Sequence, residues 1–393
     1  MIPKYYEFLN SVKILSGDKA LENIPYELKQ FNASKPIILS DAMLQKIGTV
    51  DIVIKAIGDQ LDTSTVFVDI PPDSSYKVVN AIREVYTQNN CDSIIAIGGG
   101  SVIDTAKGVR MLISQQAEDI KQLEGSEILK KGIKAPFVVV PTTSGTGSEA
   151  TLVAVISNPD EGTKKEFVSY ELLPDAAVLD VRMTETLPPK ITASTGMDAL
   201  CHALEAYTCL QKNPVSDAYA ISAMRLIGEY LEKAVDKPKD KKARIAMANA
   251  SLLAGIAFSN SMVGLVHAIG HAAGGVSHIP HGNAMAILLP HVMEFNMPKC
   301  EKLYGDVLLY LFGPEVYASA PAQERGRLCV EKIRQMLHRF NEKCGLPTRL
   351  RDDKVKEIDL LPIAEKAIND GAIVVNPVGA TKEDVLEILK KAY

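Results

Sequence analysis

No stretch of this chain approaches twenty uninterrupted apolar residues, so we expect no membrane-spanning helix. The N-terminal segment lacks the basic start and the apolar core of a signal peptide, so we expect no secretory leader. A formal net charge of −5 argues against a nucleic-acid partner or an anionic membrane surface, since both favour basic proteins. The sequence therefore predicts neither a membrane nor a nucleic-acid partner.

Cysteine is scarce and scattered. The six cysteines include no Cys-x-x-Cys pair, so we interpret them as reduced thiols of a cytoplasmic protein, most of them buried as small apolar residues. Cys201 precedes a candidate metal ligand, but on a helix its side chain points about 100° away from the next one. We therefore do not expect it to bind metal.

The first half of the chain alternates short β-branched runs with helical patterns. Strands separated by helices of ten or more residues are typical of βαβ units and a parallel sheet. An amphipathic helix is expected over residues 74–90, and strands are expected at residues 36–39, 64–68, 93–97, 136–140 and 177–180.

Strand signals all but vanish in the second half. At 393 residues the chain is also too long for one ordinary core. We place the boundary so that residues 1–187 form an α/β domain and residues 188–393 an all-helical domain. Helices of the second domain are expected at residues 195–211, 214–234, 241–259, 261–273, 323–343 and 380–392.

One carboxylate and three imidazoles in the second domain have the donor types of a transition-metal site. Two of them stand four residues apart, so on a helix they share one face. Such a set suits Fe²⁺ or Zn²⁺ and can leave a coordination position for a substrate oxygen, which the ion would polarise as a Lewis acid. The four are Asp198, His202, His267 and His281.

Five of the seven histidines fall between positions 267 and 291, and this clustering argues for a site. His271 shares a helix face with His267. It could be a further imidazole ligand, but we favour a role beside the reacting carbon, in proton relay or positioning. A set of satisfied core histidines is the competing interpretation.

A glycine-serine loop directly follows one predicted strand and opens a helix. Glycines let the backbone approach a phosphate closely, and a helix N-terminus attracts its charge. A structural turn is the alternative, because the spacing is not Gly-x-Gly-x-x-Gly. The predicted cofactor-binding residues here are Gly98, Gly99, Gly100, Ser101 and Asp104.

Two further strand ends carry candidate cofactor contacts. Thr142, Thr143 and Thr146 offer hydroxyls to a phosphate or ribose, although their loop could simply be polar. Asp41 could accept from the adenosine ribose, which would favour NAD over NADP, or it could cap the next helix.

With these motifs, nearly the whole chain resembles the iron-containing (group III) alcohol dehydrogenase family. The glycine loop alone is shared with glycerol dehydrogenases and dehydroquinate synthases. The segments that carry the resemblance together are residues 98–107, 141–149, 196–205, 264–271, 279–282 and 376–377.

The resemblance implies a dehydroquinate-synthase-like fold, with a Rossmann-like N-terminal domain, an all-α C-terminal domain and a cleft between them. It implies that the four predicted ligands hold Fe²⁺, or Zn²⁺ as in some relatives, and that Lys164 or its neighbour Lys165 reaches the cofactor. Phe258 matches a family position near the substrate pocket. Several relatives carry Asn or Arg where this chain has Leu152 and Val153, which implies a more apolar pocket.

The predicted activity is reversible hydride transfer between a small primary alcohol or aldehyde and NAD, with NADP possible. The resemblance also implies a homo-oligomer, by default a dimer. The alternatives are a glycerol-dehydrogenase-like or other polyol enzyme of the same superfamily, a metal-dependent hydrolase that would not need the glycine loop, and a non-catalytic metal-binding protein.

Overall fold

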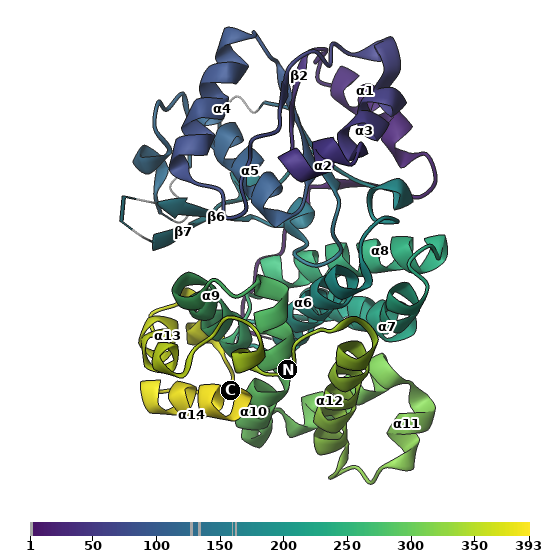
Figure 1. Ribbon diagram of the computed structural model, residues 1–393, viewed down its shortest axis with the longest axis vertical. Helices are drawn as coiled ribbons and strands as arrows, with labels where there is room; N and C mark the ends of the chain where they lie inside the picture. The colour runs from purple at the N-terminus through teal and green to yellow at the C-terminus, as the bar shows by residue number, and fades with distance from the viewer. Residues whose placement is uncertain (1–2, 126–128, 133–134, 159, 162) are drawn as a thin grey trace. The chain divides into compact units, whose positions relative to one another are not determined.

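The structure is a computed structural model that describes residues 3–125, 129–132, 135–158, 160–161 and 163–393 (Figure 1). It separates into two compact units. The α/β unit comprises Leu9–Thr143 and Gly147–Thr186. The helical unit comprises Leu187–Tyr393 together with the short segment Ser144–Thr146 and the N-terminal residues up to Phe8.

A six-stranded sheet, parallel throughout, forms the centre of the α/β unit, in the order β1-β8-β5-β4-β2-β3. Four of these strands are buried along their whole length, because helices cover both faces of a parallel sheet. All five predicted strands are confirmed. The strands are β1 Lys13–Ser16, β2 Pro36–Leu39, β3 Val66–Phe67, β4 Ser93–Gly98, β5 Phe137–Pro141 and β8 Ala176–Leu179.

Successive residues of each central strand enter different cores, as the period of two requires. Ile37 and Leu39 pack with α4 (Tyr76–Gln88) and α5 (Gly100–Gln115). Ile38 packs on the other face, where the remaining helices of the unit lie (Figure 1). These are α1 Ile24–Lys29, α2 Ala42–Lys46 and α3 Thr49–Ile57.

The sequence analysis missed β1 and an antiparallel hairpin of β6 (Val153–Asn158) and β7 (Thr163–Val168). β1 lies at the sheet edge and is mostly exposed, so it needs no apolar run. β7 carries charged residues along its exposed length, which hides its strand pattern.

The described residues after Leu187 contain helices and no strand, which confirms the predicted fold class. The predictions at 214–234 and 241–259 match α7 (Pro214–Asp236) and α8 (Lys241–Ser259) within two residues. The other helices are α6 Pro189–Thr208, α9 Leu265–Ser277, α10 His281–Phe312, α11 Pro314–Ser319, α12 Arg325–Cys344, α13 Leu360–Ala367 and α14 Lys382–Ala392.

The 32-residue helix α10 was not predicted, because it contains Pro290 and Pro298, and a proline inside a helical pattern usually ends the helix.

Small residues let the neighbouring helices approach closely. A Cβ at Gly228 of α7 would lie 2.0 Å from the carbonyl oxygen of Leu311 in α10. Within the described residues, no helix combines the length and the apolarity needed to span a membrane.

Candidate active site

Helix α6 places the first two predicted metal ligands on one face. Asp198 and His202 are both buried, and the His202 Nδ1 lies 3.8 Å from the Asp198 Oδ1. Pro189 starts the helix at a position where its missing N–H costs nothing. The predicted spacing of one turn is therefore present in the structure.

Two later helix starts bring histidines to the same carboxylate. His267 lies in the first turn of α9, and His281 is the first residue of α10. Their Nε2 atoms lie 3.8 Å and 3.3 Å from the Asp198 Oδ1. One donor atom from each of these three residues lies within 4.8 Å of the other two. Segments distant in sequence thus converge on one point.

His202 borders this group without belonging to it. Neither of its ring nitrogens lies within 4.8 Å of all three of those donor atoms. Its ring centroid lies 4.4 Å from that of His267. On the other side it stacks with Phe258 at 4.4 Å and an interplanar angle of 17°. The predicted pocket residue Phe258 is therefore in direct contact with a predicted ligand.

Three buried atoms at this point have no hydrogen-bond partner among the described residues: the Asp198 Oδ1, the His202 Nδ1 and the His267 Nε2. An unpaired buried polar atom costs about 1–3 kcal/mol, so three together are unusual without a ligand. One carboxylate and neutral imidazoles are the donors that a divalent transition ion takes. The residues present fit such an ion.

The charge states also suit a cation. Burial lowers the pKa of His202 to about 3 and holds the pKa of His267 well below its usual range, so both rings are neutral. Burial alone would raise the pKa of Asp198, but the surrounding histidine rings, His202, His281 and His267, together outweigh it and hold that pKa below its usual value. The carboxylate is therefore ionised.

A second carboxylate orients one of these histidines. The Glu205 Oε2 lies 2.5 Å from the His267 Nδ1, and its Oε1 accepts from the backbone N–H of Val266 at 2.7 Å. This contact leaves the Nε2 of His267 to face Asp198. Glu205 stands seven residues after Asp198 on the same helix face, which is the signal that sequence analysis could have used.

His271 lies beside the predicted ligands and makes a pair of its own. Its Nδ1 lies 2.9 Å from the Asp370 Oδ2. Its ring centroid lies 5.6 Å from that of His281, at an interplanar angle of 18°. Burial would raise the pKa of Asp370, but the hydrogen bond and charge interaction with His271, together with the backbone N–H of Ala372, outweigh it and lower the pKa. No sequence motif marks Asp370.

In the α/β unit, the predicted glycine loop joins β4 to α5. A Cβ at Gly98 would lie 2.5 Å from the Val102 Cβ, and one at Gly99 would lie 3.3 Å from the Thr143 Oγ1. The Thr142 N–H donates to the carbonyl of Gly98 at 3.1 Å. These glycines and threonines thus meet at the carboxyl ends of neighbouring strands, where ligands of α/β sheets bind. Thr146 lies in the segment Ser144–Thr146, which groups with the helical unit.

Asp104 and Lys107 of α5 point into the protein. Both oxygens of Asp104 are engaged, since one accepts from the Ser148 hydroxyl at 2.6 Å and the other from the Val155 N–H at 2.9 Å. Lys107 has no exposed surface and donates to the carbonyls of Thr151 and Val153 at 2.9 Å and 2.7 Å. Through these hydrogen bonds, both side chains hold the segment 148–155, which leads into β6, against α5.

The remaining predicted contacts lie at other loops of the α/β unit. Asp41 caps α2, since its Oδ1 accepts from the Leu44 N–H at 2.9 Å. The Lys164 Nζ lies 2.6 Å from the Asp73 Oδ1. The Asp73 N–H in turn donates to the Ser101 hydroxyl at 3.3 Å. Val153 is the first residue of β6 and is partly buried.

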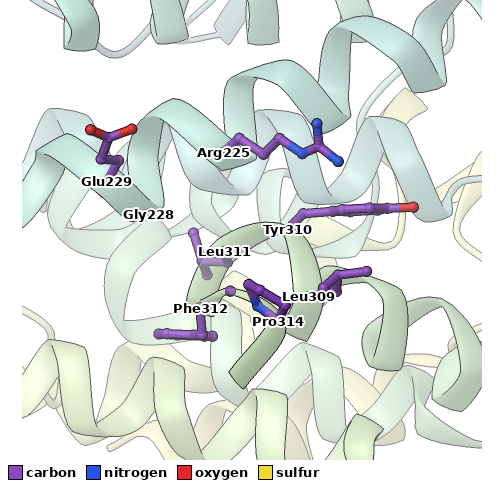
Figure 2. Close-up of a pocket in the computed structure, with 9 residues that line it drawn as sticks. Arg225, Gly228, Glu229, Leu309, Tyr310, Leu311, Phe312 and Pro314 are labelled. Carbon is purple, nitrogen blue, oxygen red and sulfur yellow. The ribbon is translucent and has the colours of Figure 1, made fainter. Parts of the chain in front are cut away.

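A groove in the helical unit contains none of the predicted residues. It lies between α7 and the C-terminal end of α10, lined by Arg225, Gly228 and Glu229 and by residues 309–314 (Figure 2). His281 is at the opposite end of α10, and at 1.5 Å per residue the separation along the helix is about 40 Å. The groove is distinct from the histidine cluster.

Comparison with known proteins identifies the family. A family model described as iron-containing alcohol dehydrogenase matches residues 11–181, and the model of the C-terminal part of that family matches residues 192–393. The NAD-dependent methanol dehydrogenase of Bacillus methanolicus is 36% identical over 378 residues, covering 96% of this chain and 97% of that protein. Alcohol dehydrogenase 4 of Saccharomyces cerevisiae is 37% identical over 379 residues, covering 96% of each chain.

Comparison with solved structures points to the same kind of enzyme. A crystal structure of 1,3-propanediol oxidoreductase superposes with a TM-score of 0.93 at 32% identity, covering 99% of this chain and 100% of that one. An alcohol dehydrogenase from Oenococcus oeni gives 0.92 at 32% identity, with 99% and 100% covered.

The chain belongs to the iron-containing alcohol dehydrogenase family. It is a metal-dependent oxidoreductase that exchanges a hydride between an alcohol and a nicotinamide cofactor, which confirms the resemblance and the enzyme class predicted from the sequence.

Proposed function

We propose that this enzyme interconverts small primary aliphatic alcohols and their aldehydes with NAD as cofactor and Fe²⁺ as metal. The observation that carries the proposal is the convergence of donor atoms of Asp198, His267 and His281 on one point, where buried atoms of Asp198 and His267 have no hydrogen-bond partner among the described residues.

Four residues would hold the ion: Asp198, His202, His267 and His281. Bound there, a divalent cation supplies Lewis-acid polarisation of a substrate oxygen. By affinity order alone these donors favour zinc over iron. Membership in an iron-containing family supports iron, with zinc as the alternative.

The cofactor would bind at the sheet edge of the α/β unit. Its pyrophosphate would lie over Gly98, Gly99, Gly100 and Ser101, close to Thr142, Thr143, Thr146 and Lys164. Asp104 would contribute indirectly, because both of its oxygens are engaged by the protein. Asp41 uses one oxygen as a cap, and its other oxygen would accept from the ribose 2′-hydroxyl, which favours NAD over NADP.

The substrate pocket would be small and apolar. Phe258 supports this, since its ring stacks on His202 at the candidate metal site. Val153 would add an apolar side chain. The relatives include a methanol dehydrogenase and, at 35% identity, the 1,3-propanediol dehydrogenase of Citrobacter freundii, which supports alcohols of few carbons.

His271 would take the proton of the reaction. Oxidation converts the alcohol and NAD⁺ into the aldehyde, NADH and one proton. The hydride leaves the carbinol carbon for the nicotinamide, so the hydroxyl proton needs a separate acceptor. The ring of His271 lies next to those of His267 and His281, which suits that role.

We further propose a cytoplasmic homo-oligomer, with a dimer as its simplest form. All six cysteines are free thiols, as a reducing compartment requires. Two-fold dimers are the commonest soluble oligomers. Light scattering on the purified protein tests the oligomeric state.

The decisive experiment loads the enzyme with Fe²⁺ or Zn²⁺ and screens alcohols, diols and aldehydes with both nicotinamide cofactors, following the absorbance of the reduced nicotinamide. We expect the highest rates with short primary alcohols and NAD⁺. The variant His267→Ala should lose both metal and turnover. Absence of turnover from a fully metal-loaded enzyme with every alcohol would contradict the proposal.

Cofactor choice is tested separately. In Asp41→Gly the ratio of kcat/KM for NAD⁺ to that for NADP⁺ should fall, because the carboxylate that repels a 2′-phosphate is gone. An Asp41→Asn variant keeps a helix cap and controls for stability. An unchanged ratio in both variants would remove Asp41 from the cofactor site.

A further inference from the structure

Asn376 is a buried asparagine whose side-chain amide uses its full hydrogen-bonding capacity. Its Oδ1 accepts from the backbone N–H of Leu265 at 3.2 Å and from the Nδ2 of Asn296 at 3.0 Å. Its Nδ2 donates to the Oδ1 of Asn296 at 2.8 Å and to the carbonyl of Val378 at 2.7 Å. An amide offers two donor hydrogens and two acceptor positions, so these contacts fix the side chain in one orientation.

The segment 375–378 contacts the three helices that carry the proposed metal ligands. Leu265 is the first residue of α9, and Asn296 lies inside α10. The backbone N–H of Leu210, just after the end of α6, donates to the carbonyl of Val375 at 2.8 Å. One short segment near the end of the chain therefore joins α6, α9 and α10 within the helical unit.

The first turn of α9 has no capping side chain of its own, because Gly264 occupies the N-cap position. Its free N–H groups are instead satisfied by residues distant in sequence. Leu265 donates to Asn376, and the next residue donates to the Glu205 Oε1. A Cβ at Gly264 would lie 3.1 Å from each of these two acceptor oxygens. Asn376 and Glu205 together therefore determine where α9 starts.

We propose that Asn376 is a positioning residue of the metal site. By holding the start of α9 against α10, it keeps the Nε2 of His267 at the point where the donor atoms converge. The inference rests on the proposed function, because it requires that His267 binds the ion. Glu205 orients the imidazole ring, and Asn376 fixes the backbone from which the ring projects. A site that is organised before its ligand arrives loses less conformational freedom on binding, so it binds more tightly.

The first test measures metal affinity, with Co²⁺ as the probe because it accepts the same donor types as Fe²⁺ and Zn²⁺. Competition with a chromophoric chelator gives its dissociation constant. The variant Asn376→Ala should bind Co²⁺ about ten- to hundredfold more weakly, as expected for a residue that orients a metal ligand. A residue that only stabilises the fold would lower the melting temperature and leave the affinity of the folded protein unchanged. An affinity equal to that of the parent would overturn the proposal.

A second variant tests the same contact from α10. Asn296→Ala removes one partner of the Asn376 amide but leaves the contact with Leu265 in place. We expect a smaller loss of Co²⁺ affinity than in Asn376→Ala, about tenfold. If Asn376→Ala does not fold, Asn296→Ala decides, and a parent-like affinity in it would overturn the proposal.

The matched control is Asn213→Ala. Asn213 is also buried and caps a helix, since its Oδ1 accepts from the N–H groups of Val215 and Ser216 at the start of α7. Helix α7 carries no proposed ligand. This variant should lose thermal stability as Asn376→Ala does but keep the Co²⁺ affinity of the parent. An equal loss of affinity in Asn213→Ala would overturn a specific role of Asn376.

His267→Ala separates this inference from the proposed function. If this variant binds Co²⁺ as tightly as the parent, the proposed metal site itself fails. If His267→Ala loses the ion but Asn376→Ala keeps the affinity of the parent, only the role of Asn376 fails.

Discussion

At the scale of single residues, the candidate metal site depends on a carboxylate that is not itself a proposed ligand but contacts one. Glu205 is buried and contacts His267 through one oxygen and the backbone of α9 through the other. Burial raises its pKa to about 7. A histidine oriented in this way presents a fixed nitrogen, and such partners tune metal affinity nearly as much as the ligands do.

Replacement of Glu205 by Gln should therefore weaken metal binding about ten- to hundredfold, because the single, uncharged amide oxygen cannot accept from both Val266 and His267. Competition with a chromophoric chelator measures the affinity. Glu229→Gln on the exposed face of α7 serves as the control and should bind metal normally. Equal affinity in both variants would mean that Glu205 has no influence on the ion.

At the scale of elements, helix α5 and the hairpin β6–β7 form one assembly. Lys107 donates to Ser148, Thr151 and Val153, and Asp104 accepts from Ser148 and from the backbone of Val155. The hairpin carries Lys164, so these buried contacts determine where a proposed cofactor contact lies.

In the variant Lys107→Met the free energy of unfolding should fall by about 3 kcal/mol, because several buried acceptors lose their hydrogen-bond donor. Its affinity for NAD⁺ should fall while its metal content stays normal. Urea unfolding and fluorescence titration measure the two quantities, with the exposed Lys121→Met as control. Unchanged NAD⁺ affinity in a folded Lys107→Met would separate this assembly from the cofactor site.

Lys107 also makes stability depend on pH. Burial lowers its pKa from the ordinary 10.5 to about 8 in the folded protein. Between these values the unfolded chain still holds a proton that the folded protein has released, so stability rises with pH across this window. The free energy of unfolding, measured as a difference between the parent and Lys107→Met, should therefore grow from pH 8 to 10.5. A flat difference would show that the buried lysine keeps an ordinary pKa.

Packing of α7 against α10 depends on Gly228. An added Cβ would lie 2.0 Å from the carbonyl oxygen of Leu311, so the helices must separate. Gly228→Ala should destabilise the protein by about 1–3 kcal/mol. Gly275→Ala is the matched control, since nothing lies within 4 Å of its Cβ position. Equal melting temperatures would show that the groove at this helix end adapts without cost.

At the scale of the whole molecule, the two units have separate cores and separate candidate sites. All proposed metal ligands lie in the helical unit, and the glycine loop lies in the α/β unit. A ligand stabilises the state to which it binds. Each ligand should therefore protect mainly the unit that supplies its contacts.

Hydrogen exchange tests this expectation. Removing the metal with a chelator should speed amide exchange in α6, α9 and the first turns of α10, because the buried donor atoms are left unpaired. Exchange in β4 and α5 should change little. Adding back Fe²⁺ restores protection and activity if the proposal holds. Uniform change across both units would contradict separate sites.

Much of the fold was predictable because its signals are local. The buried strands are continuous β-branched runs, and α7 carries buried residues at helical spacing along most of its length. The failures share a physical reason. β1 and β7 are mostly exposed and carry polar residues, and α10 continues through two prolines, which usually end a helix.

The sequence by itself determined the family, the fold class and the donor types of the metal site, since helical spacing and strand-end loops are short-range patterns. Only the tertiary structure decided which groups meet. Glu205 lies 62 residues from His267, and Asp370 lies 99 residues from His271. Contacts over such separations arise from helix packing in the common core, and packing has no signature in the order of residues along the chain.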